Sequence, residues 1–171
     1  RLHATRHDHL NGVARAEAIV GARGDALGQR EDGLGNLEGR LLVSTDNPGS
    51  PNVIGGYYGN WAGAVGATIG GGGRSGNITR VNDNYGTVSG GSYNRAGDNS
   101  FSATDAEFAT VGGGYWNTAS GYDSTVGGGE KNTASGESAT VAGGFGNIAS
   151  GGFSAIPGGL SNSVEGAYSF A

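Results

Sequence analysis

The fold of this chain is decided by residues 110–136, TVGGGYWNTASGYDSTVGGGEKNTASG, in which one pattern occurs twice. Val111 and Val126 stand fifteen residues apart, and each is followed by three glycines, by Asn six places on and by Ala eight places on. The matched positions continue through four copies: Val111, Val126, Val141, Ile156; Asn117, Asn132, Asn147, Asn162; Ala119, Ala134, Ala149, Val164; and Gly121, Gly136, Gly151, Gly166. So regular a spacing predicts a repeat protein whose successive coils stack and bury the apolar positions.

Local alternation indicates how each coil is built. Polar and apolar residues alternate around Val126 and Ala134, which is typical of short β-strands. We expect Val126 and Ala134 to point inward and Thr125 and Thr133 to point outward, with glycines making the tight reversals. The sequence therefore predicts an all-β, thin, flattened parallel β-solenoid with two strands and two turns per coil. The Asn of each coil is predicted to be structural, bonded to its stacked neighbours and to the turn backbone.

Looser copies of the pattern upstream predict about seven coils over residues 51–171. They are Val88 with Asn94 and Ala96, Ile54 with Asn60 and Ala62, and Ile69 with a late Asn77. The steps from Ile69 to Val88 and from Val88 to Val111 exceed one coil by four and eight residues. We place the excess around residues 80–85 and 98–107, and we expect both insertions to emerge as loops suited to binding.

Residues 1–50 form a separate region with a seven-residue period. The segments GARGDAL, GQREDGL and GNLEGRL end in Leu27, Leu34 and Leu41. Leu heptads are typical of coiled coils. Each heptad here also carries one or two glycines, and each glycine costs about 1 kcal/mol in a helix. This favours short strands or further β-roll coils, with a trimeric helical stalk as the alternative. Residues 42–51 predict a strand and then a turn-rich joint.

Composition excludes several other classes of protein. The 38 glycines come in clusters and not at every third position, which excludes collagen. The net charge is only −5 and the apolar residues are strictly placed, unlike in a disordered chain. There is no Cys, which excludes a disulfide scaffold, a thiol nucleophile and a Cys-ligated metal. The acidic balance argues against nucleic acid as a partner, and no apolar run approaches the roughly 20 residues of a membrane span.

Residues able to do chemistry are sparse in the repeat. The three His are all near the start, at His3, His7 and His9, so no Ser-His-Asp triad is predicted in the coils. Several carboxylates occupy outward or turn positions and are predicted to be solvated surface, among them Asp105, Glu107, Asp123, Glu130 and Glu137. We therefore predict no catalytic residues, no cofactor and no metal site, and a protein that is not an enzyme.

Three motifs leave sharper alternatives open. His7 and His9 could hold a transition-metal ion on a trimer axis, the plainer interpretation being a polar terminus. Residues 23–25 spell Arg-Gly-Asp, an integrin-binding tripeptide, although the heptad also accounts for it. An outward Thr ladder is similar to that of ice-binding solenoids, although β-propensity explains Thr there as well. Its members are Thr68, Thr87, Thr110, Thr125 and Thr140.

The half-coils Ser-x-Val-x-Gly and Asn-x-Ala-x-Gly resemble the head repeats of trimeric autotransporter adhesins of the YadA type. The stretches SPNVIGGYYGN, ATIGGGG and NDNYGTVSGG also resemble repeat regions of bacterial surface proteins and phage tail fibres. The resemblance runs from about Ser50 to Ala171. It implies a left-handed parallel β-roll that forms a homotrimer, although the coil here is one residue longer than in those heads.

These observations lead us to expect a non-enzymatic structural or adhesive fibre module that is extracellular or at the cell surface. A thin roll buries little apolar area, so we expect a homo-oligomer, either a trimer or an end-to-end filament. Outward aromatic residues suit such contacts: Tyr115, Trp116, Tyr122, Phe145, Phe153, Tyr168 and Phe170. The alternatives are a phage tail-fibre shaft, with a virion location, and a glycan-binding module that uses Tyr115, Trp116 and Tyr122.

Overall fold

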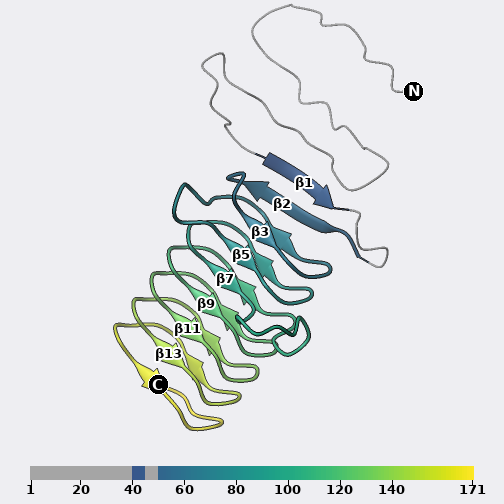
Figure 1. Ribbon diagram of the computed structural model, residues 1–171. Coiled ribbons are helices and arrows are strands. Elements are labelled where there is room, and N and C mark those ends of the chain that lie inside the picture. The colour runs from purple at the N-terminus through teal and green to yellow at the C-terminus, as the bar shows by residue number, and fades with distance from the viewer. Residues whose placement is uncertain (1–39, 45–49) are drawn as a thin grey trace, which may run out of the picture.

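The computed structural model describes residues 40–44 and 50–171. Within them the chain winds into a β-solenoid of two flat sheets, whose short strands lie one above another along the stack (Figure 1). No helix occurs in the described residues. The expected parallel solenoid with about seven coils of roughly fifteen residues is therefore confirmed. Most of the seven-residue repeats of the N-terminal region, including the Arg-Gly-Asp tripeptide, lie outside the described residues.

One sheet, here called the Val sheet, carries the Val or Ile of each coil. Its strands, in order, are β1 (Arg40–Ser44), β2 (Asn52–Gly56), β4 (Thr68–Ile69), β6 (Thr87–Val88), β8 (Thr110–Val111), β10 (Thr125–Val126), β12 (Thr140–Val141) and β14 (Ala155–Ile156). All pairs are parallel except β1 with β2, which is antiparallel. The strand predicted from residue 42 onward is thus β1, and it covers the open edge of the first coil.

The opposite sheet, here called the Ala sheet, carries the small apolar residue of each coil and is parallel throughout. Its strands, in chain order, are β3 (Trp61–Ala62), β5 (Arg80–Val81), β7 (Arg95–Ala96), β9 (Thr118–Ala119), β11 (Thr133–Ala134), β13 (Ile148–Ala149) and β15 (Ser163–Val164). Val126 and Ala134 are fully buried between the sheets, while Thr125 and Thr133 face outward. The predicted inward and outward positions are confirmed.

The Asn positions form an internal ladder, as predicted. In Asn132, Nδ2 donates to the carbonyl oxygens of Gly128 and Gly144, both at 2.9 Å. Its Oδ1 accepts the backbone N–H of Asn147 at 3.0 Å, one coil further along. The side chain is fully buried. Asn132 therefore closes its own turn and holds the next coil, so the repeated Asn is used for folding.

Turns alternate between the two long edges of the flattened roll. We call the edge with turns 112–117, 127–132, 142–147 and 157–162 the Asn edge, and the edge with turns 120–124, 135–139 and 150–154 the Gly edge. The prediction that glycines make the reversals is confirmed in part, because Gly114, Gly129 and Gly144 have positive φ in turns of the Asn edge. Non-glycine residues adopt left-handed backbone conformations on both edges, for example Trp116 (φ 58°) and Phe153 (φ 57°). Their N–H groups donate to the preceding coil, to Ser92 O and Glu137 O, which helps to offset the strain.

Many glycines serve close stacking instead. Gly121, Gly136 and Gly151 do not adopt a left-handed backbone conformation, but a Cβ on any of them would overlap the backbone of the next coil along the chain. The same holds for Gly112 and Gly127. Glycine is required at these positions because strands in neighbouring coils stand only about 4.8 Å apart.

The first insertion lies elsewhere than expected. Arg80 and Val81 form β5 in regular register with Trp61 and Ala62, so residues 80–85 hold no extra residues. The four additional residues lie in the preceding turn, where Arg74 and Asn77 form a small antiparallel bridge. Thr79 consequently takes the place of the Asn in this coil. The second insertion is where it was predicted, between β7 and β8.

Candidate functional site

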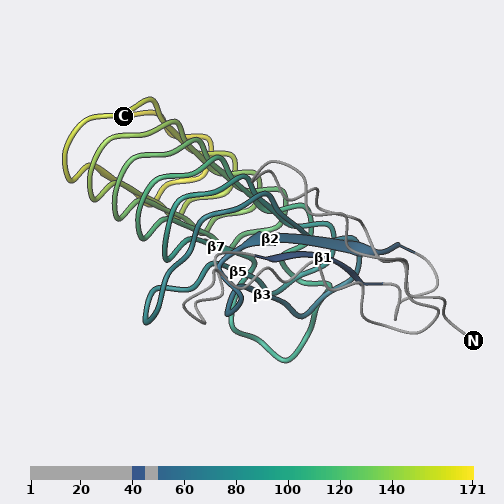
Figure 2. The same ribbon diagram turned by 90° about the horizontal axis from the view of Figure 1, so that it is seen from above.

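The second insertion, residues 97–109, is here called the acidic loop, and it projects from the Gly edge of the roll (Figure 2). Asp83 lies two residues after Val81, the position that Gly121 and Gly136 occupy in later coils. Asp98 holds the same position one coil further on. Two carboxylates therefore stack where later coils have only glycine. Asp105 returns along the loop, and one carboxylate oxygen from each of the three lies within 4.8 Å of the others.

Hydrogen bonds fasten the acidic loop to the preceding coil. Asp83 Oδ2 accepts the N–H of Asp98 at 2.8 Å, and Asn82 Nδ2 donates to Asp98 O. Asn84 holds the far end of the loop, because its Nδ2 donates to Glu107 Oε1 at 2.9 Å and its N–H donates to Ala103 O at 2.9 Å. The two segments that the sequence singled out, 80–85 and 98–107, thus lie side by side.

The electrostatics at this point are unfavourable for three carboxylates alone. Asp83 is 1% exposed, and its Oδ1 has no hydrogen-bond partner. Burial raises the pKa of Asp83, and the hydrogen bond from the Asp98 N–H opposes this shift. The negative charges of Asp98 and Asp105 and a side-chain hydrogen bond with Asp105 raise the pKa further. Asn82 Oδ1 is also buried without a partner.

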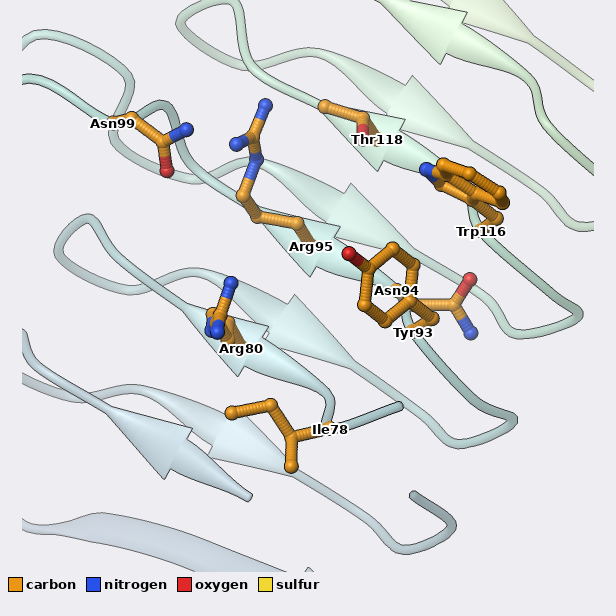
Figure 3. Close-up of a pocket in the computed structure, with 8 residues that line it drawn as sticks. All are labelled: Ile78, Arg80, Tyr93, Asn94, Arg95, Asn99, Trp116 and Thr118. Atoms are coloured by element: carbon orange, nitrogen blue, oxygen red, sulfur yellow. The ribbon is translucent and has the colours of Figure 1, made fainter. Parts of the chain in front are cut away.

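A cavity of about 240 Å³ lies on the outer face of the Ala sheet beside the acidic loop. Figure 3 shows the Arg95 side chain between Asn99 on one side and Tyr93 with Trp116 on the other. Arg80 and Arg95 are register partners on β5 and β7. The remaining lining residues are Ile78, Asn94 and Thr118.

The arginines of this cavity are incompletely paired. Arg95 Nε is buried without a partner, and neither arginine lies within ion-pair distance of a carboxylate among the described residues. Burial lowers the pKa of Arg95, the charge of Asp98 opposes that shift, and the charge of Arg80 adds to it. Two guanidinium groups beside two aromatic rings make the cavity suited to a planar anionic group.

Exposed aromatic side chains form rows along both edges. On the Gly edge Tyr85 stacks on Phe108 with ring centroids 5.3 Å apart, and Phe153 stacks on Tyr168 at 5.2 Å. On the Asn edge Tyr93 meets Trp116 edge-on at 5.2 Å. The Lys131 ammonium group lies 5.8 Å from the Trp116 ring centroid and 5.1 Å from that of Phe145. The predicted outward placement is confirmed for all the aromatic residues of that set except Tyr115, which is half-buried.

Several sequence-based candidates are not brought together. Tyr122 packs against Phe108 on the Gly edge, whereas Tyr115 and Trp116 lie on the Asn edge, so the predicted glycan-binding trio does not converge. Asp105 is exposed, as predicted, but its carboxylate also lies close to those of Asp83 and Asp98, which the sequence did not indicate. The residues His3, His7 and His9 lie outside the described part of the chain.

The Thr ladder is present but stands alone. Thr68, Thr87, Thr110, Thr125 and Thr140 are in register on the Val sheet. The outer face of the Ala sheet instead carries Trp61, Arg80, Arg95, Thr118, Thr133, Ile148 and Ser163. A second flat Thr face is therefore missing from the described coils.

A scan against models of known protein families gives no match for this chain, and a search of curated protein sequences gives none. In residues 40–44 and 50–171 there is no helix with the length and apolar character needed to cross a membrane.

Proposed function

We propose that this chain is a non-enzymatic structural module of an extracellular or cell-surface fibre, and that it assembles as a homotrimer through its exposed aromatic rows. The observation that carries the proposal is that different positions of each coil serve different purposes. The recurring Val, Ala, Asn and Gly are used for packing and stacking, while large aromatic side chains remain exposed on the edges. The resemblance to trimeric adhesin heads, and more widely to surface and tail-fibre repeats, supports the same assignment.

Apolar exposure of this kind favours association. Trp116, Phe145 and Phe153 are each between 41% and 48% exposed, although aromatic residues normally bury most of their area. Aromatic residues are also enriched where protein surfaces meet. Because the rows run along the axis, one subunit can contact another over many coils. A modest gain in association free energy per coil then adds up along the stack.

The test compares two paired variants of the full chain by sedimentation velocity. Trp116→Ser with Phe145→Ser removes two exposed aromatic side chains of the Asn edge, and Phe153→Ser with Tyr168→Ser removes two of those on the Gly edge. Thr125→Ser with Thr140→Ser on the outer face of the Val sheet is the control. We expect one aromatic pair, and not the control, to convert trimer into monomer while the circular dichroism spectrum stays unchanged. A trimer that survives both aromatic pairs would contradict this interface.

Glycan binding is a second candidate function, and the arginine–aromatic cavity favours it. Its ligand would be an acidic sugar, because Arg80 and Arg95 can pair with a carboxylate or sulfate while Tyr93 or Trp116 packs against the ring. A glycan array screened with the full chain and with Arg95→Gln tests this. Binding to acidic glycans that the variant loses would support the candidate, and failure to bind any array member would leave the module purely structural.

A further inference from the structure

We propose that Asp83, Asp98 and Asp105 bind one divalent cation of the calcium class, which fastens the acidic loop to the coil that precedes it. Nothing in the proposed fibre function requires this site. The inference rests on three features: the way in which the stack brings these residues together, an oxygen buried without a partner, and the spacing of the carboxylates.

The repeat itself creates the convergence. Asp83 and Asp98 are fifteen residues apart and occupy the same position in consecutive coils. In later coils that position must be glycine, because the next coil lies directly against it. The acidic loop follows this position in the second of the two coils, and its return path brings Asp105 back to the pair. Stacking places the first two carboxylates, and the loop supplies the third.

The second observation is the unsatisfied oxygen of Asp83. This residue is 1% exposed, so water cannot solvate its carboxylate freely, yet Oδ1 accepts no hydrogen bond. A buried carboxylate without full pairing is costly, and two further carboxylates nearby add repulsion. A bound cation would remove both penalties. Asn82, the neighbouring residue, offers another buried oxygen without a partner.

The geometry suits a hard cation with oxygen ligands. Calcium binds oxygen at about 2.3–2.6 Å, so two oxygens on one ion lie at most about 5 Å apart. The three carboxylate oxygens meet this limit, since they all lie within 4.8 Å of one another. Every ligand offered is oxygen, which selects calcium-like ions over zinc or copper. Ser100 already forms hydrogen bonds with some of these carboxylate oxygens. Its N–H donates to Asp98 Oδ1 at 2.7 Å, and its hydroxyl donates to both oxygens of Asp105. Water would complete the coordination.

Arg95 is the competing source of positive charge. The negative charges of Asp98 and Asp83 act to raise the pKa of Arg95, so its guanidinium group interacts electrostatically with both carboxylates. Among the described residues, however, no ion pair joins Arg95 to a carboxylate. Figure 3 shows its guanidinium group on the outer face of the sheet, toward Asn99. The cluster is therefore left without a direct counter-charge.

The test is calorimetric titration of the full chain with calcium chloride after removal of bound ions with EDTA. We expect one site per chain with a Kd on the order of 10⁻⁴–10⁻³ M. At about 10 mM calcium we expect the melting temperature to rise by roughly 3–8 °C. Chymotrypsin should cleave more slowly after Phe101, which is fully exposed in the acidic loop, because the bound ion restrains that loop.

Variants separate binding from general stability. Asp98→Asn should weaken calcium binding at least tenfold and remove the protection of Phe101. Asp83→Asn should abolish the calcium-dependent shift while leaving the calcium-free melting temperature equal or higher, because it removes a buried charge. Asp123→Asn, an exposed carboxylate on the same edge, is the matched control and should bind calcium as the wild type does.

Three results would overturn the proposal. One is the absence of both heat and melting shift up to about 10 mM calcium, a ceiling set well above the affinities of extracellular modules. Another is an equal loss of calcium binding in Asp123→Asn, which would indicate diffuse charge screening. The third is calcium binding by Arg95→Gln but not by the wild type, which would show that Arg95 serves as the counter-charge. All of these readouts are independent of the oligomeric mass.

Discussion

Truncation of a ladder asparagine in the middle of the roll, Asn132→Ala, should be among the most damaging single changes outside the hydrophobic core. The side chain makes four hydrogen bonds: Nδ2 donates to Gly128 O and Gly144 O, and Oδ1 accepts from the backbone and side-chain nitrogens of Asn147. Asn147 is fully buried, so its N–H would be left without an acceptor.

The expected magnitude follows from those bonds. An orphaned buried donor costs about 1–3 kcal/mol, and each bond to a half-buried carbonyl contributes roughly 0.5–1.5 kcal/mol. Together the loss should be about 3–5 kcal/mol of unfolding free energy. Because coils contact only their neighbours, the break also weakens coupling between the two halves of the stack.

Asn162→Ala in the last coil is the matched control. Asn162 donates to Asn147 Oδ1 at 3.1 Å and to Gly158 O at 2.9 Å, but no following Asn donates to it in the described coils, and it is only half-buried. Its loss should cost about 1 kcal/mol. The assay is urea denaturation followed by far-ultraviolet circular dichroism, at one fixed protein concentration. Equal losses of stability in the two variants, or a loss below about 1 kcal/mol for Asn132→Ala, would refute the stabilising contribution that we assign to the Asn ladder.

Three further outcomes are expected. Gly136→Ala should lower the unfolding free energy by about 2–4 kcal/mol, because the new Cβ would overlap the backbone of Gly151. In the same denaturation assay Gly128→Ala should change it by no more than about 0.5 kcal/mol, because no atom lies within 4 Å of its Cβ. Thr79→Val should be neutral or stabilise by about 1 kcal/mol, because the hydroxyl that it removes is buried without a partner; a marked fall in melting temperature would show that this hydroxyl is bonded. Arg95→Gln should leave the melting temperature within a few degrees but abolish any binding of acidic glycans, and retained binding would place the sugar elsewhere.

The strict repeat made much of the fold predictable. Val126 and Asn132 recur at fixed spacing because the same packing must be repeated in every coil, and so their burial could be inferred from the sequence. The left-handed conformation of Trp116 could not be inferred, because backbone propensity alone assigns such positions to glycine. It is stabilised by a hydrogen bond to the preceding coil, a tertiary contact that only the assembled stack provides.

The first insertion was misplaced for a related reason. The spacing from Ile69 to Val88 gives the number of extra residues but not the half of the coil that holds them. Thr79 concealed the true position, because it occupies the ladder without being Asn. The antiparallel strand β1 was likewise visible only as a strand, since pairing direction depends on the turn between it and β2.

The carboxylate cluster left a signal that single-residue inspection does not reveal. Asp83 and Asp98 look like ordinary surface residues until they are aligned on the coil, where each stands in place of a stacking glycine. Asp105 carries no such mark, because the path of a thirteen-residue loop (97–109) is not periodic. The fold can therefore be predicted from the repeat, whereas the candidate site can be recognised only in the tertiary structure.

The mass of the full chain in solution, measured by light scattering after size exclusion, tests the proposed assembly most directly. A trimeric module predicts three times the chain mass of 16.9 kDa, without dependence on concentration over the range used. A mass of 16.9 kDa throughout that range would contradict the account, because the exposed aromatic rows would then serve no contact between copies of this chain.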